Sequence, residues 1–363
     1  MKYMEEYRDP RIARGLLEKI AQRSHRDVRL MEVCGTHTMS IFKSGIRSAL
    51  PSSITLLSGP GCPVCVTAQG EIDAFIELSR RQDVIVTTFG DLMRVPGQAS
   101  SLQGERAEGR DIRVVYSASD ALDIAAKNLE KKVVFLGVGF ETTAPTVAAS
   151  ILAAKATGTG NFSVFSAHKR VPPALEALMK VVGLRLDGLI LPGHVSVIIG
   201  EKVYSPLSKK HAMPCAIAGF EPVDILQAIS SLLEQIERDE PKVENCYPRA
   251  VAYDGNTRAQ QVMETVFETV DATWRGLGEI PASGLGIRED FAAFDARKIF
   301  DLPVSDAEEP KGCACGEILT GMKIPPECPL YREVCKPTDP VGPCMVSSEG
   351  TCAAYYGNNV IAQ

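Results

Sequence analysis

Short β-branched or apolar runs alternate with helical patterns from Val28 to about Glu237. This alternation is typical of a mostly parallel α/β sheet. The expected strands are residues 28–33, 54–58, 84–88, 112–116, 133–136, 162–166, 188–191 and 214–218. The expected helices are residues 68–81, 118–128, 142–156, 172–182 and 221–236. So many strands predict two α/β units.

The sequence changes character after Pro241. A polar stretch leads to a helical pattern around residues 258–269, then to the Gly-rich run RGLGEIPASGLGI and a tail rich in Cys and Pro. Such a tail has few large apolar residues, so its fold needs a stabilising cross-link such as a metal cluster. We expect a first α/β domain over residues 1–120, a second over 121–240 and a C-terminal domain over 241–363.

Composition and charge exclude several classes of protein. The formal net charge of -6 gives no broad positive field, so nucleic acid is a poor candidate partner. The first twenty residues are charged and amphipathic and contain no apolar core of a signal peptide. No apolar run reaches the ~20 residues that a membrane span needs. We therefore expect a cytoplasmic protein with no membrane partner.

The chain contains 11 cysteines, which in a reducing compartment are more often metal ligands or redox thiols than a disulfide framework. Two of them, Cys215 and Cys246, stand alone and are interpreted as structural. Three lie in Gly-rich turns near the start and six crowd the tail: Cys34, Cys62 and Cys65, then Cys313, Cys315, Cys328, Cys335, Cys344 and Cys352.

Cys34 follows the first expected strand, in the run Met31 to His37. In open parallel sheets ligands bind outside the carboxyl ends of the strands, so Cys34 is expected to point into a cleft with His37 nearby. A thiolate there can bind a metal or attack an electrophile. The alternative is a buried structural cysteine beside a capping threonine.

A C-x-x-C pair, Cys62 and Cys65, lies between the second expected strand and a helix. A helix N-terminus favours the thiolate form, as in redox-active dithiols. The pair is interpreted as a dithiol/disulfide switch. Two zinc ligands are the alternative, but no second C-x-x-C follows at a zinc-finger spacing.

Other strand-end turns carry polar residues, among them Asp91, Glu141 and His194. Any one of them alone is more often turn chemistry than a site. The step Gly137-Val138-Gly139 resembles a dinucleotide fingerprint, but a threonine occupies the third glycine position, so nucleotide binding is not expected.

The tail cysteines predict an iron-sulfur cluster, because cysteine thiolates are its usual ligands. Their spacing, C-x-C and then gaps of 12, 6, 8 and 7 residues, matches neither a zinc ribbon nor a bacterial ferredoxin. Four thiolates in a small module also suit tetrahedral zinc, which stays as the alternative.

Long ungapped words over nearly the whole chain resemble the HypD family. They are EVCGTHT (32–38), GPGCPVC (59–65), TFGDLMRVPG (88–97), GFETTAPT (139–146), PGHVSVIIG (192–200), AGFEP (218–222), WRGLG (274–278), CGEILTG and MVSSEGTCAAYY. The resemblance implies two similar, mostly parallel α/β domains around a central cleft and a smaller Cys-rich domain. That domain would carry a [4Fe-4S] cluster on Cys315, Cys328, Cys335 and Cys352, with Cys313 and Cys344 left over as a redox pair.

The resemblance also implies a function in maturation of [NiFe]-hydrogenases. In this family, HypD with HypC holds an Fe(CN)2CO group before its transfer to the hydrogenase large subunit, and HypE delivers cyanide. Cys34 matches the iron-binding cysteine, and soft thiolates suit such an iron. A relay from the cluster through Cys313/Cys344 and Cys62/Cys65 would support ligand transfer, with His37, Asp91, Glu141 and His194 tuning or protonating the cleft.

Such a protein is an assembly factor with redox activity more than a conventional turnover enzyme. Two other functions compete with it. A stand-alone iron-sulfur thiol-disulfide reductase would use the C-x-x-C pair but has no use for Cys34 and His37. A zinc-stapled binding protein would have no redox role and would be colourless.

Overall fold

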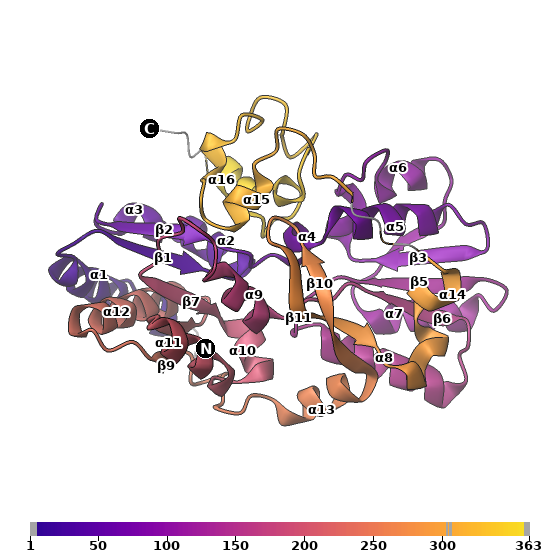
Figure 1. The fold of residues 1–363 in the computed structure, drawn as a ribbon, viewed down its shortest axis with the longest axis horizontal. Helices are drawn as coiled ribbons and strands as arrows, with labels where there is room; N and C mark the ends of the chain where they lie inside the picture. The colour runs from indigo at the N-terminus through magenta and orange to yellow at the C-terminus, as the bar shows by residue number, and fades with distance from the viewer. Residues whose placement is uncertain (1–5, 303, 305–306, 359–363) are drawn as a thin grey trace.

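The computed structural model describes residues 6–302, 304 and 307–358. Two all-parallel sheets form the framework (Figure 1). The first has the order β2-β1-β7-β8-β9, with β1 Val28–Glu32, β2 Ile54–Ser58, β7 Gly188–Pro192, β8 Cys215–Ala218 and β9 Val243–Asn245. The second has the order β4-β3-β5-β6, with β3 Val84–Thr88, β4 Ile112–Val114, β5 Lys132–Gly137 and β6 Phe162–Ser166.

Helices connect the strands and cover the sheets. The α-helices are α1 Pro10–Arg23, α2 Gly35–Lys43, α3 Ile46–Ala49, α4 Pro63–Val66, α5 Gln69–Ser79, α6 Leu102–Ala107, α7 Ala118–Lys127, α8 Ala144–Thr157, α9 Val171–Leu178, α10 Gly193–Ile199, α11 Ser205–His211, α12 Pro222–Arg238, α13 Thr257–Val266, α14 Ala296–Phe300, α15 Cys315–Leu319 and α16 Thr351–Gly357. Short 3-10 helices are η1 Glu6–Arg8, η2 Gly90–Arg94, η3 Lys202–Tyr204, η4 Glu289–Phe294, η5 Pro325–Glu327 and η6 Pro343–Met345.

The central strands are apolar runs because helices bury both of their faces. Every residue of β3, β6, β7 and β8 is buried. The helix α12 packs on β7 and β8 and against α1, whereas α7 and α8 pack on the second sheet. This burial confirms the predicted α/β fold with two parallel sheets.

The predicted strands agree closely with the structure, whereas the helix expected over 172–182 ends already at Leu178. β2, β3 and β6 have the expected bounds, and the other five predicted strands differ by one or two residues at an end. The helix expected over 258–269 is wrong at its C-terminal end, because α13 stops at Val266 and β10, Phe267–Trp274, follows. Most of the Gly-rich run after it forms β11, Gly278–Ile287, which pairs antiparallel with β10.

The two sheets are not consecutive parts of the chain. β3 and β4 lie before residue 120 and β5 and β6 after it, yet β3 pairs with β5 in one sheet, whereas β1 pairs with β7. The expected division at residue 120 therefore falls inside the second sheet. Parallel strands are joined by long crossovers, so neighbours in sequence need not be neighbours in a sheet. Domain boundaries remain a prediction.

The Cys-rich tail forms a third, loop-rich region of short helices, drawn yellow in Figure 1. Its last helix, α16, packs on α2, and its 3-10 helix η6 packs on α4. The β10–β11 hairpin reaches toward the same place, where Trp274 forms a bridge with Thr67. Among the described helices, none is long and apolar enough to cross a membrane.

Candidate functional site

The loops that follow β1 and β2 meet at one edge of the first sheet. The two strands are adjacent and parallel, with Glu32 opposite Ser58, so their carboxyl ends lie together. The Gly35 N–H donates to the Gly61 carbonyl at 3.0 Å. A Cβ on Gly61 would lie 2.2 Å from the Cys34 nitrogen. Only glycine therefore lets the C-x-x-C loop rest on the backbone of Cys34.

Cys34 is a buried thiol at the start of α2. It is 8% exposed, and its N–H donates to Glu32 Oε2 at 3.2 Å. Burial raises the pKa of Cys34 to about 12, and backbone N–H groups of His37 and Thr36 oppose this shift. The closed site therefore holds Cys34 as a neutral thiol at physiological pH.

His37 lies on the same helix, but its side chain forms hydrogen bonds with the backbone at the end of β8. Its Nε2 donates to the Gly219 carbonyl at 2.9 Å, and Nδ1 has no partner among the described residues. Burial lowers the pKa of His37 to about 4. Phe220 stacks on both His37 and the exposed His194, with ring centroids 4.7 and 3.8 Å apart. His37 and His194 thus share one edge of the sheet with Cys34.

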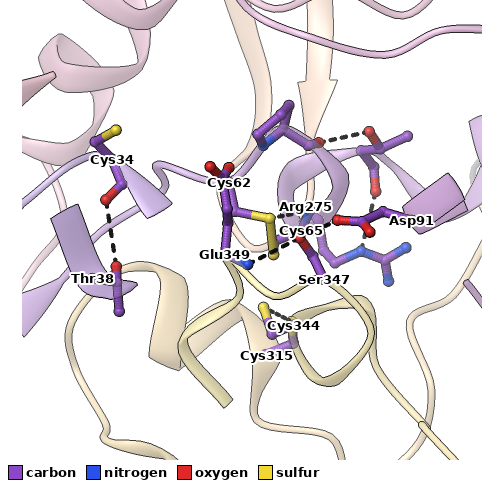
Figure 2. The surroundings of a disulfide bond; sticks show 12 residues. Cys34, Thr38, Cys62, Cys65, Asp91, Arg275, Cys315, Cys344, Ser347 and Glu349 are labelled. Carbon is purple, nitrogen blue, oxygen red and sulfur yellow. Dashed lines mark hydrogen bonds between the residues drawn. A yellow bond between two sulfur atoms is a disulfide. The ribbon is translucent and has the colours of Figure 1, made fainter. Parts of the chain in front are cut away.

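Cys62 and Cys65 form a disulfide at the start of the short helix α4. Both are buried, and Cys62 Sγ accepts the Cys65 N–H at 3.2 Å. Because α4 packs on η6, the disulfide lies beside the part of the tail that carries Cys344. Figure 2 shows the disulfide with Cys34 and the Cys315–Cys344 pair around it.

The tail loop of residues 346–350 contacts both η2 and the start of α2. Ser347 Oγ donates to Asp91 Oδ2 at 2.8 Å, which binds the loop to η2. Thr36 Oγ1 donates to Glu349 Oε1 at 2.7 Å, and a Cβ on Gly35 would lie 2.5 Å from Glu349 Cβ. The loop therefore covers the start of α2 directly after Cys34.

Glu141 belongs to the second sheet, in the loop after β5. It is 2% exposed, and its carboxylate oxygens accept the Val171 N–H at 3.0 and 3.2 Å. Burial raises the pKa of Glu141 to about 7. Its hydrogen bonds are with the start of α9 and do not join it to Cys34.

All six tail cysteines line one small cavity of about 10 Å³, together with Ile318, Tyr331, Gly342 and Met345. Cys315 and Cys344 have their sulfurs 3.0 Å apart, and all six thiols are free. Cys315 thus lies next to Cys344, and the expected pairing of Cys344 with Cys313 stays a prediction. In the described part of the chain, no three His, Cys, Asp or Glu residues are grouped to hold a single metal ion.

Comparison with known proteins identifies the family. The HypD model, described as "Hydrogenase formation hypA family", matches residues 11–359. The chain belongs to the HypD family. It is 46% identical to hydrogenase maturation factor HypD of Azotobacter vinelandii, covering 98% of this chain and 96% of the relative.

Two further relatives agree with this family. HypD of Escherichia coli K12 is 43% identical, with 98% of both chains covered. A putative hydrogenase expression/formation protein of Methanocaldococcus jannaschii is 46% identical, with 94% of both chains covered. The whole chain, and not one segment of it, therefore matches hydrogenase maturation factors of the HypD family.

Sequence reasoning missed three polar residues at this HypD site. Glu32 is buried and accepts hydrogen bonds from Thr38 and from the Cys34 backbone. Glu349 covers the start of α2, and Arg275 lies buried beside the C-x-x-C loop. Each stands inside a sequence motif quoted above, but a charged residue in a motif gives no sign of which distant loop it contacts.

Proposed function

We propose that this chain is a scaffold in [NiFe]-hydrogenase maturation that, with HypC, holds iron through Cys34 while cyanide and carbonyl ligands are added. The supporting observation is the contact of three thiol-bearing segments. The C-x-x-C loop rests on the Cys34 backbone through Gly61, and α4 packs on the tail segment of Cys344. Family membership links this arrangement to hydrogenase maturation.

Cys34 is proposed to bind the iron cargo together with the N-terminal cysteine of HypC. Soft thiolates suit a low-spin iron that carries cyanide and carbonyl. Because a thiol binds metal as the thiolate, coordination displaces the proton that burial keeps on Cys34. The tail loop must also move, since Glu349 covers the start of α2.

The tail is proposed to hold a [4Fe-4S] cluster on Cys315, Cys328, Cys335 and Cys352. The donor set fits, because all six tail cysteines line one cavity and the Val341 N–H donates to Cys335 Sγ at 3.4 Å. When bound, the cluster supplies single electrons.

The disulfide pair is proposed to provide the reducing step of cyanide transfer. Release of cyanide from a thiocyanate leaves a thiolate and consumes two electrons. The dithiolate of Cys62 and Cys65 gives two electrons when its sulfurs join as the disulfide, so the step balances. Cys344 lies beside α4 and, with Cys313 as expected, would return the pair to the dithiol.

The remaining polar residues are proposed to support this site. Asp91 holds the tail loop through Ser347, whereas His37 and His194 form the stacked edge near Cys34. Glu141 is a buried carboxyl group that can exchange a proton near neutral pH. The proposed partners are HypC, HypE and indirectly the hydrogenase large subunit, in the reducing cytoplasm.

Replacing one redox thiol tests the proposal. The Cys62→Ala variant, co-expressed with the maturation partners, is expected to accumulate cyanide-loaded iron more slowly than wild type, as followed by infrared spectroscopy. Cys246→Ala is the matched control, because Cys246 is a buried thiol of the first sheet. Loading of the Cys62→Ala variant at the wild-type rate would refute the proposed redox step.

A stand-alone thiol-disulfide reductase is the second candidate, and the buried disulfide beside Cys344 favours it. Such an enzyme would reduce a protein disulfide without HypC and would keep its activity in Cys34→Ala. Disulfide reduction by wild type and by this variant, assayed with insulin, separates the two functions.

A further inference from the structure

Arg275 is a buried cation in the turn between β10 and β11. It is 2% exposed, although arginine is rarely buried without a charged partner. Its Nε donates to the Thr67 carbonyl and its Nη2 to Gln69 Oε1, both at 3.1 Å. Its Nη1 has no hydrogen-bond partner among the described residues. Both acceptors are neutral, so among the described residues the Arg275 guanidinium group forms no ion pair.

The backbone of Arg275 is fixed between two thiol segments. Its N–H donates at 2.9 Å to the carbonyl of Val66, which directly follows the C-x-x-C pair. The next residue, Gly276, has a φ of +79°, and a Cβ there would lie 2.4 Å from the Cα of Gly316. Gly316 directly follows Cys315 in the tail. Figure 2 shows Arg275 near both the disulfide and the Cys315–Cys344 pair.

A buried charge without a partner is costly, so a nearby anion stabilises it. Glu309 lies nearby, since its Oε1 accepts the Gly276 N–H at 3.0 Å, but among the described residues no ion pair joins it to Arg275. The other neighbouring groups that can become anionic are thiols. The disulfide of Cys62 and Cys65 is neutral when oxidised and gains negative charge only when it is reduced.

We propose that Arg275 stabilises the thiolate of the reduced Cys62–Cys65 pair and thereby makes the disulfide easier to reduce. The inference rests on the proposed redox function of this pair. The disulfide takes two electrons and one proton to give one thiol and one thiolate, and an external dithiol supplies both electrons as it closes to its own disulfide. A stabilised reduced form makes the couple more oxidising.

A thiol-exchange equilibrium tests the proposal. Full-length protein is equilibrated anaerobically with mixtures of reduced and oxidised dithiothreitol, the thiols are alkylated, and the peptide carrying Cys62 and Cys65 is analysed by mass spectrometry. Arg275→Gln is expected to lower the reduction equilibrium constant roughly tenfold, or ~30 mV. Arg275→Lys keeps the charge and is expected to stay within about twofold of wild type.

Two controls separate the charge from packing. Arg297→Gln removes another arginine, one that pairs with Glu71 and lies on Phe165, and is expected to leave the constant unchanged. Arg275→Met is a second uncharged variant, expected to match Arg275→Gln, and it replaces that variant if the glutamine version does not fold. An unchanged constant in the uncharged variants, or an equal shift in Arg275→Lys, overturns the proposal.

The same samples distinguish this inference from the proposed function. The exchange equilibrium needs neither a cluster nor hydrogenase partners. If the wild-type protein contains no iron or sulfide, this result contradicts the proposed cluster and leaves the effect of Arg275 intact. A full complement of iron and sulfide with no effect of the Arg275 charge would contradict this inference alone.

Discussion

At Gly61 the C-x-x-C loop packs directly on the backbone of Cys34. The substitution Gly61→Ala is therefore the sharpest test of the site's geometry. The added Cβ would lie 2.2 Å from the Cys34 nitrogen, 2.4 Å from the Val33 carbonyl carbon and 2.5 Å from the Cys34 Cα. All three are backbone atoms that no rotamer change can move. Carbon contacts normally lie at ~3.5–4.0 Å, so the two loops must separate by about 1 Å.

The expected cost of this substitution has two parts. Overpacking of a closely packed site costs about 1–3 kcal/mol. The separation also breaks the hydrogen bond from the Gly35 N–H to the Gly61 carbonyl, which contributes about 1 kcal/mol. We expect Gly61→Ala to lower the free energy of unfolding by roughly 2–4 kcal/mol. Urea denaturation with an unchanged slope measures this difference.

A glycine with free space around it provides the control. Gly15 lies inside α1, and a Cβ there would meet nothing within 4 Å. Gly15→Ala is expected to stabilise the protein by about 0.5–1 kcal/mol, because alanine favours the helix. The geometric reasoning is refuted if Gly61→Ala is as stable as wild type and loads cyanide on iron at the wild-type rate.

Three other predictions follow from the same structure. Glu349→Ala is expected to speed alkylation of Cys34 by uncovering α2, whereas Glu349→Gln keeps an acceptor; equal rates in both would contradict this covering role. Because burial raises the pKa of Glu141 from 4.5 to about 7, its folded form keeps a proton that the unfolded chain loses. Wild type should therefore lose about 3 kcal/mol of stability between those pH values relative to Glu141→Gln, measured by urea unfolding, and parallel pH profiles would contradict this. Cys328→Ala is expected to lose the tail iron and sulfide that Cys313→Ala retains, and equal iron in both would contradict the proposed ligand set.

The strands could be predicted because buried parallel strands carry their own signal. The runs over β3, β6 and β7 are apolar and bounded by turn residues, so local pattern is enough to place them. The order of strands could not be predicted in the same way. The pairing of β1 with β7 depends on which crossover packs on which face, and no local pattern records that.

The β10–β11 hairpin was missed because its sequence lacks the usual strand signal. β11 contains three glycines, which favour turns, and the close packing of Val270 explains the lack of a side chain at two of them. Gly284 and Gly286 would each place a Cβ within about 3 Å of a Val270 or Ala272 side chain. The glycines that suggest a loop are thus those that let the two strands pack closely.

The candidate thiols could be found from sequence, but their surroundings could not. Motif spacing indicated Cys34, Cys62 and Cys65, since each follows a strand. The covering of Cys34 by Glu349 and the placement of Arg275 join residues more than two hundred positions apart. Such contacts depend on how the tail and the hairpin pack on the sheets, which local patterns do not contain.

Infrared spectroscopy of the anaerobically purified protein co-expressed with HypC tests the central proposal most directly, when wild type is compared with Cys34→Ala. The account predicts cyanide and carbonyl bands in wild type that vanish in the variant, while about four irons per chain remain in the tail. Bands that persist in Cys34→Ala, or that are absent from wild type in the presence of all maturation partners, would contradict it.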